Sequence, residues 1–180
     1  MKRFAISAFA VAAIAALTPF PAAAQSDAYI KCVAEKSDPD VGAMLVDQFL
    51  SEQGLADAPE PFVSDFRQGL VSCSRDHAAS QEEATQFAKV AIVRLMMPPL
   101  RVRLDDEGID LDAVDGVLAL ETNDGSGPSV EENDLIFATM IAQLVDERGA
   151  NRDLLSYLMA SYTESARIDR EARASVGGTK

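Results

Sequence analysis

The strongest constraint on the fold is one apolar run, residues 84–97, which reads ATQFAKVAIVRLMM. Its spacing predicts a helix that is apolar on most faces, and such a helix has neighbouring elements on most sides. Two prolines, Pro98 and Pro99, follow directly, and proline normally ends a helix. The run therefore predicts the central helix of an all-helical bundle, with its two charged side chains, Lys89 and Arg94, pointing outward at the rim.

Amphipathic segments on both sides of this run predict the other helices. Their apolar residues recur at helical spacing, and most segments begin at a capping side chain or end at glycine. We expect these helices over residues 27–36, 39–53, 62–76, 111–121 and 130–148, and from 151 onward. The last two would form an antiparallel hairpin, with residues 135–145 as the main contact of the central helix. The fold class is an irregular all-α bundle of six or seven helices.

Residues 100–122 allow two interpretations. Residues 100–104 (LRVRL) alternate between apolar and charged, as a half-buried strand does. A lone strand cannot satisfy its own backbone hydrogen bonds, so we prefer an extended connector followed by a helix that Asp110 caps. The alternative pairs this segment with residues 116–122 in a short β-hairpin.

Residues 1–24 predict a secretory signal peptide. The chain begins with a short positive region that includes Lys2 and Arg3, an apolar stretch follows, and small residues precede an expected cleavage between Ala24 and Gln25. The apolar stretch is shorter than the ~20 residues that span a bilayer. We therefore expect a periplasmic or secreted protein, with one helical domain over residues 25–174 and a disordered tail over residues 175–180.

The charge balance is strongly acidic. The chain has 16 basic and 29 acidic residues and a formal net charge of −13, which becomes −15 when the signal peptide with its two basic residues is removed. Nucleic acids and anionic membranes bind positive surfaces, so neither is expected as a partner. A basic protein or divalent cations fit the charge better. No later segment is apolar for long enough to span a membrane.

The two cysteines, Cys32 and Cys73, are expected to form a disulfide. Oxidising compartments form disulfides and keep them, and closing a loop of ~42 residues would stabilise the fold by ~4 kcal/mol on the chain-entropy model. The alternative is a metal site with His77, four residues after Cys73. A zinc site needs three or four such ligands, and His77 is the one histidine of the chain.

An acidic segment, residues 105–115, is the candidate cation site. The segment does not match the calcium loop of an EF-hand. When the loop is started at Asp110, Val114 falls at the fifth position, where a ligand belongs, and Asp115 falls at the sixth, where glycine belongs. A looser divalent-cation site remains the alternative, and a hydrolase could also use these acids. The candidate ligands are Asp105, Asp106, Asp110 and Asp112.

No catalytic or cofactor motif is present. The sequence lacks a Gly-x-Ser-x-Gly elbow, a His-Glu-x-x-His helix and the Walker and dinucleotide glycine patterns, so we expect no cofactor. The leading interpretation is a non-catalytic protein-interaction module, of the stress or immunity type by analogy of architecture alone. Its candidate contact surfaces are the acidic segment and one row of arginines: Arg167, Arg170 and Arg173. The sequence leaves the oligomeric state open.

Overall fold

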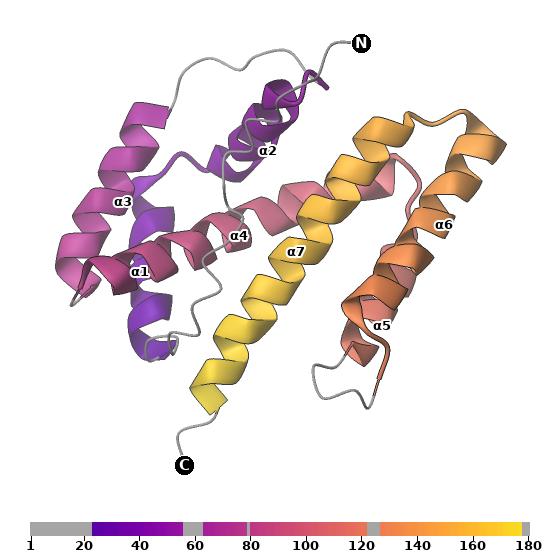
Figure 1. The fold of residues 1–180 in the computed structure, drawn as a ribbon. Helices are drawn as coiled ribbons and strands as arrows, with labels where there is room; N and C mark the ends of the chain where they lie inside the picture. Colours follow the sequence, from indigo (N-terminus) through magenta and orange to yellow (C-terminus); the bar gives the residue numbers. More distant parts are fainter. Residues whose placement is uncertain (1–22, 56–62, 79, 122–126, 178–180) are drawn as a thin grey trace, which may run out of the picture.

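The computed structural model describes residues 23–55, 63–78, 80–121 and 127–177. All regular secondary structure in these residues is helical, which confirms the all-α class (Figure 1). The helices are α1 (Ala23–Lys36), α2 (Val41–Glu52), α3 (Val63–His77), α4 (Gln81–Asp106), α5 (Leu111–Leu120), α6 (Val130–Arg148) and α7 (Arg152–Gly177). None of them is long and apolar enough to cross a bilayer.

Helix α4 runs through the middle of the molecule, as its sequence predicts. It contacts α1, α2, α3, α5 and α7 (Figure 1), and the side chains it buries include Phe87, Val90 and Val93. The prediction that residues 135–145 are its main contact is wrong, because α7 packs along α4 while α6 lies outside and packs on α5 and α7. The apolar run of α6 is accordingly not fully covered: Leu135 is 70% exposed and Ile136 is 43% exposed.

Helix α4 continues through Pro98 and Pro99 to Asp106, so the predicted extended connector and the alternative hairpin at 100–122 are both wrong. The alternating pattern also places Leu100 and Leu104 four residues apart on one helical face, and both are buried. Val102 then falls on the opposite side and is 61% exposed. Burial of that face in the core outweighs the local cost of the prolines.

The second proline is accommodated by close packing with α2. Pro99 has no N–H to offer the carbonyl of Leu95, four residues earlier. Gly42 of α2 lies directly against that carbonyl oxygen, and a Cβ at position 42 would overlap it. Glycine at this position therefore lets the backbone of α2 approach the place where α4 lacks a hydrogen bond.

A hydrogen-bonded turn joins α4 to α5. The amide of Ile109 donates to the carbonyl of Leu104 at 2.9 Å, and the amide of Gly108 donates to that of Asp105 at 2.8 Å. This is the Schellman pattern, with Gly108 in the left-handed region at φ 86° and Ile109 buried beside the helix end. Asp110 then caps α5 by accepting from the amide of Ala113 at 3.0 Å, as predicted.

The predicted ends of the later helices are also confirmed. Ser129 and Glu132 form a reciprocal capping box at α6, Gly149 ends that helix at φ 66°, and Asn151 accepts from the first amides of α7. Helix α7 extends to Gly177, three residues into the predicted tail, while residues 178–180 lie outside the described part. Of the predicted signal peptide, residues 1–22 also lie outside it.

The core has two clusters, and α4 contributes to both. One lies among α1, α2, α3 and the first half of α4, and it contains Tyr29, Val33 and Phe87. The other lies among the second half of α4 and α5 to α7, with α2 at its edge, and it contains Leu104, Leu118 and Tyr162. The two clusters meet along α4, which makes this helix common to both halves.

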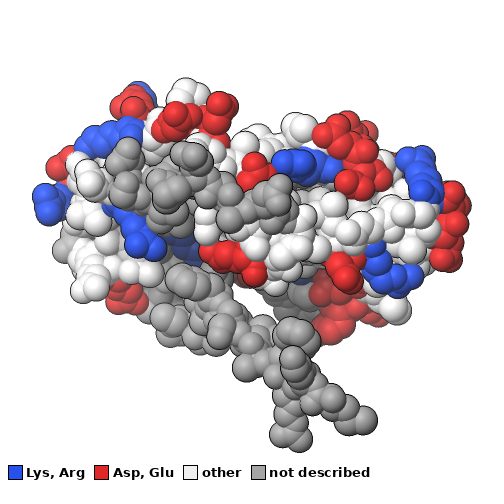
Figure 2. Space-filling model, turned by 90° about the horizontal axis from the view of Figure 1, so that it is seen from above, with Lys and Arg blue, Asp and Glu red and all other residues white. Residues whose placement is uncertain are grey.

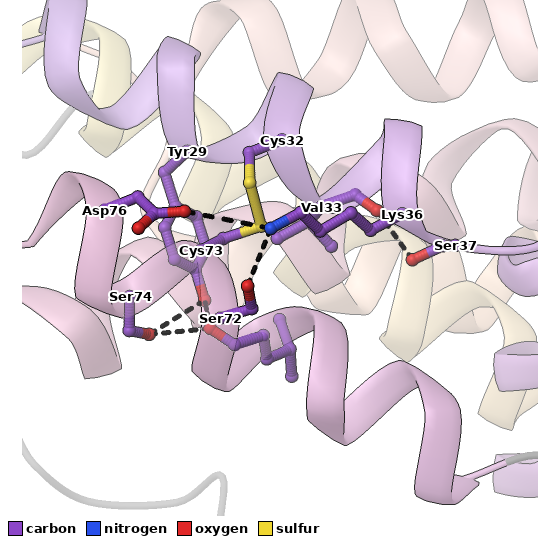
Figure 3. The surroundings of a disulfide bond; sticks show 10 residues. Tyr29, Cys32, Val33, Lys36, Ser37, Ser72, Cys73, Ser74 and Asp76 are labelled. Atoms are coloured by element: carbon purple, nitrogen blue, oxygen red, sulfur yellow. Dashed lines mark hydrogen bonds and ion pairs between the residues drawn. A yellow bond between two sulfur atoms is a disulfide. The ribbon is translucent and has the colours of Figure 1, made fainter.

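The predicted disulfide is confirmed. Cys32 on α1 bonds to Cys73 on α3, with the Cα atoms 5.9 Å apart (Figure 3). Polar contacts flank it on the same two helices: the ammonium of Lys36 donates to the hydroxyl of Ser72 at 2.6 Å and lies 3.8 Å from a carboxylate oxygen of Asp76. Because both sulfurs are bonded to each other, neither thiolate is available to a metal beside His77.

Candidate functional site

The acidic segment forms a defined surface around the turn between α4 and α5. We call this surface the acidic turn; its members are Asp105, Asp106, Glu107, Asp110 and Asp112. Four of the five side chains are exposed, and Glu107 is partly exposed. The carboxylate of Asp110 caps α5. No described residue forms an ion pair with any of the five. Arg148 of α6 lies against Gly108 but forms no such pair either. The surface therefore keeps its negative charge.

The arginines nearest in sequence do not neutralise the acidic turn. Arg101 pairs with Asp115 at 2.6 Å, and Arg103 pairs with Asp47 on α2 at 2.8 Å. Between these two arginines stands the exposed Val102, three and four residues before two of the acids and therefore beside them on the helix surface. An apolar side chain edged by free carboxylates is suited to contact with a basic protein surface.

Acidic side chains are also found elsewhere on the surface. On the face seen in Figure 2 they occur on both sides of the molecule, with basic side chains between them. Other exposed acids, such as Glu164, also have no ion pair among the described residues. The acidic turn is distinguished because five such carboxylates lie within eight consecutive residues, 105–112, around one turn.

The four candidate cation ligands are not gathered at one point. In the described residues, no group of three or more His, Cys, Asp or Glu side chains is placed to hold a metal ion. Asp105 and Asp106 lie in the last turn of α4, whereas Asp110 and Asp112 lie beyond Gly108 at the start of α5. The cation site remains a prediction from the sequence.

The arginine row of α7 lies against other helices. Arg167 is bonded to Glu121 at 2.9 Å and to Asp134 at 2.9 Å, and its side chain is only 15% exposed. Arg170 donates to the backbone carbonyl of Glu121 at 3.3 Å. Arg173 donates to Asp169 at 2.8 Å but remains largely exposed. These guanidinium groups bind within the chain, and their role as partner contacts remains a prediction.

Glu121 is the centre of this polar cluster. Burial by itself raises the pKa of its carboxyl group, but hydrogen bonds from Arg167 and Asn133, together with the nearby positive charges, outweigh burial and lower it. The amide nitrogen of Asn133 donates to Glu121 at 3.1 Å, while the buried amide oxygen of Asn133 has no hydrogen-bond partner among the described residues. Glu121 is therefore held as a carboxylate that fixes the end of α5 against α6 and α7.

Arg94 is a second ion-pair centre, and the prediction that it points outward at the rim is wrong. Its side chain is 25% exposed; it donates to Asp169 on α7 at 2.6 Å and to Asp27 on α1 at 2.8 Å. A cation on a mostly apolar helix is tolerated in this half-buried position because two carboxylates from different helices meet it. Arg94 therefore joins three helices.

A third polar group contains Tyr162 of α7. Its hydroxyl donates to Asp115 at 2.6 Å and accepts from Arg101, whose guanidinium also lies over the tyrosine ring. Burial and the adjacent carboxylate raise the pKa of Tyr162 to about 12. Sequence reasoning placed Asp115 in the acidic contact segment and did not predict its bonds to Tyr162 and Arg101, although an aspartate between Val114 and Val117 in an apolar helix signals a charge that needs a partner.

A shallow groove runs along the outer side of the α6–α7 hairpin, with a volume of about 440 Å³. Its floor is made by Phe137, Ile141 and Met159. Sequence reasoning did not find this groove, because it depends on how α6 and α7 pack.

Comparison of the chain with protein-family models, with curated proteins and with solved structures finds no match.

Proposed function

We propose that this is an exported, non-catalytic protein that acts by binding a more basic protein, and that the acidic turn is the contact surface. The observation that carries the proposal is the concentration of five carboxylates within eight residues of one capped turn, none of which has a basic partner among the described residues. Because Gly108 and the Asp110 cap hold the turn in one conformation, little conformational entropy is lost when a partner binds.

The acidic turn supports this role better than the arginine row does. Arg167 would have to leave Glu121 to bind a partner, and the buried carboxylate would then lose its counter-charge. Asp105 and Asp106 bear no such cost, since they have no ion pair among the described residues to give up. Exposed charges of this kind raise the rate of association and make it sensitive to salt.

Export to the periplasm or the cell exterior is part of the same proposal. The Cys32–Cys73 disulfide supports it, because such bonds persist in oxidising compartments and are rare where glutathione keeps thiols reduced. The pattern of residues 1–24 supports it independently.

Charge reversal tests the contact surface. In Asp105→Lys with Asp106→Lys, binding of the basic partner recovered from an extract of the producing cells should weaken by at least about tenfold, and the effect should shrink in high salt. The control carries the same change in net charge elsewhere, at Asp146→Lys with Glu171→Lys, two exposed positions. Equal binding by both double variants would contradict the proposal.

Calcium titration separates this proposal from the cation-binding alternative. A contact surface predicts no rise in the melting temperature at micromolar calcium. A rise that chelator reverses and that Asp105→Asn with Asp106→Asn abolishes would instead assign the acidic turn to a cation.

A further inference from the structure

The groove along α6 and α7 leaves part of an apolar surface open to solvent. Its middle is lined by small side chains, Ala138, Ser156 and Ala160, which leave the floor open. Leu135 is largely exposed. It stands three residues before Ala138 and so lies beside it on the surface of α6. Both ends of α6 are capped, which favours its helical conformation.

Opposite charges mark the two ends of this groove. Asp134 and Glu164 line one end, and Arg152 lines the other. Arg152 and Glu164 are both exposed, and neither has an ion-pair partner among the described residues. They lie twelve residues apart on α7, a distance of about 18 Å at roughly 1.5 Å per residue. Arg167 also lines the acidic end, but it is held by Glu121 and Asp134.

A two-fold rotation makes this charge pattern complementary to itself. If two copies meet face to face about an axis through the middle of the groove, the direction of the groove reverses. Glu164 of each copy then lies at the Arg152 end of the other, and Leu135 of each copy meets the groove floor of its neighbour. Isologous contacts of this kind are the commonest in soluble oligomers, and two antiparallel hairpins packed together make a four-helix arrangement.

We propose that the α6–α7 groove is the interface of a homodimer, with a second copy of this chain as its occupant. Leu135 and the groove floor supply the apolar contact, and two Arg152–Glu164 pairs fix the register. This interface lies on a different surface from the acidic turn, so it is independent of the proposed binding of a basic partner.

Sedimentation velocity of the purified protein over a concentration series tests the dimer. The parent should sediment as a dimer that dissociates on dilution. Ala160→Arg, which places a bulky charge in the middle of the groove at an exposed position, should raise the dissociation constant by at least about tenfold. Ala119→Arg, at an exposed position on α5, is the control and should leave it unchanged. A parent that is monomeric at every concentration overturns the proposal, as does a dimer that Ala160→Arg does not weaken.

A charge swap tests the two-fold register. Arg152→Glu and Glu164→Arg should each weaken the dimer, and the double variant should restore it because the pairs reform with reversed sign. A double variant as weak as the single ones would overturn this register. Far-ultraviolet circular dichroism spectra that match the parent's verify that each variant is folded, so loss of the dimer cannot be attributed to unfolding.

Discussion

The two halves of the core are held together by different chemistry. In the N-terminal half, α1 and α3 have 14 and 15 residues and are joined by the disulfide. In the C-terminal half, α6 and α7 have 19 and 26 residues, and half-buried arginine–carboxylate pairs tie them to α5. Short helices bury little apolar surface, so a covalent bond adds most there. The halves should therefore respond to different agents, the first to reductant and the second to acid.

Of the changes considered, removing the disulfide should lower the free energy of unfolding the most. In Cys32→Ser with Cys73→Ser, the free energy of unfolding should fall by about 4 kcal/mol, because the unfolded chain regains the entropy that the closed loop had removed. Urea denaturation measures the loss, and hydrogen exchange should show it first in α1 and α3. Faster exchange confined to α6 and α7 would contradict the assignment of the disulfide to the N-terminal half.

The counterpart in the C-terminal half is Arg167→Ala. It leaves the carboxylate of Glu121, whose side chain is 5% exposed, without its charge partner. The free energy of unfolding should fall by about 3 kcal/mol, because a buried charge is left uncompensated. Urea denaturation measures this loss as well. Arg67→Ala, at an exposed arginine on α3 that has no ion pair among the described residues, is the control and should change stability by less than about 0.5 kcal/mol. Equal effects of the two variants would show that the Arg167 pair is not a determinant of this half.

Replacing glycine by alanine should change the free energy of unfolding in opposite directions at two positions, one in each half. Gly42→Ala places a methyl group against the Leu95 carbonyl. This overpacking should destabilise the protein by about 2 kcal/mol. Gly116 lies inside α5 with open space around it. Because alanine favours the helix, Gly116→Ala should stabilise the protein by about 0.5 kcal/mol. Melting temperatures of the two variants make the comparison, and the same sign for both would mean that α2 does not approach α4 as closely as described.

Acid should act on the C-terminal half with the smallest of these effects. The pKa of Glu121 is lowered on folding from an ordinary value of 4.5. This group therefore adds stability that is complete above its unfolded pKa and is lost as the pH falls through the folded pKa. Urea midpoints measured from about pH 7 to about pH 3 should fall at the acid end. The fall should be shallower in Glu121→Gln, since that side chain does not titrate. A parallel fall in both would exclude Glu121 as a source of the acid sensitivity.

The sequence predicted those features that depend on residues close together in the chain. Ser129, Gly149 and Asn151 define helix ends through their own backbone and the next few amides, so local pattern was sufficient. The pairing of Cys32 with Cys73 was also predictable, because two cysteines allow one intramolecular disulfide.

Features that depend on distant residues were not predictable. Pro98 and Pro99 taken alone indicate a helix end. The helix continues because Leu100 and Leu104 are buried and because Gly42 of α2 packs against the carbonyl that lacks a hydrogen bond, and neither contact can be seen in the local sequence. Arg94 was assigned to the rim because its partners lie 67 and 75 residues away. The groove along α6 and α7 is another such feature, since a long apolar run does not reveal which of its sides a neighbour covers.

The position of Arg94 also bears on when the protein can fold during its synthesis. Its two carboxylate partners come from the first helix of the described chain and from the last, so this junction requires both α1 and α7. The surface of α4 that α7 covers stays open until α7 has been made. Folding of the described residues should accordingly finish only once α7 is present, and a chain that lacks α7 would expose the apolar centre around which the molecule is built.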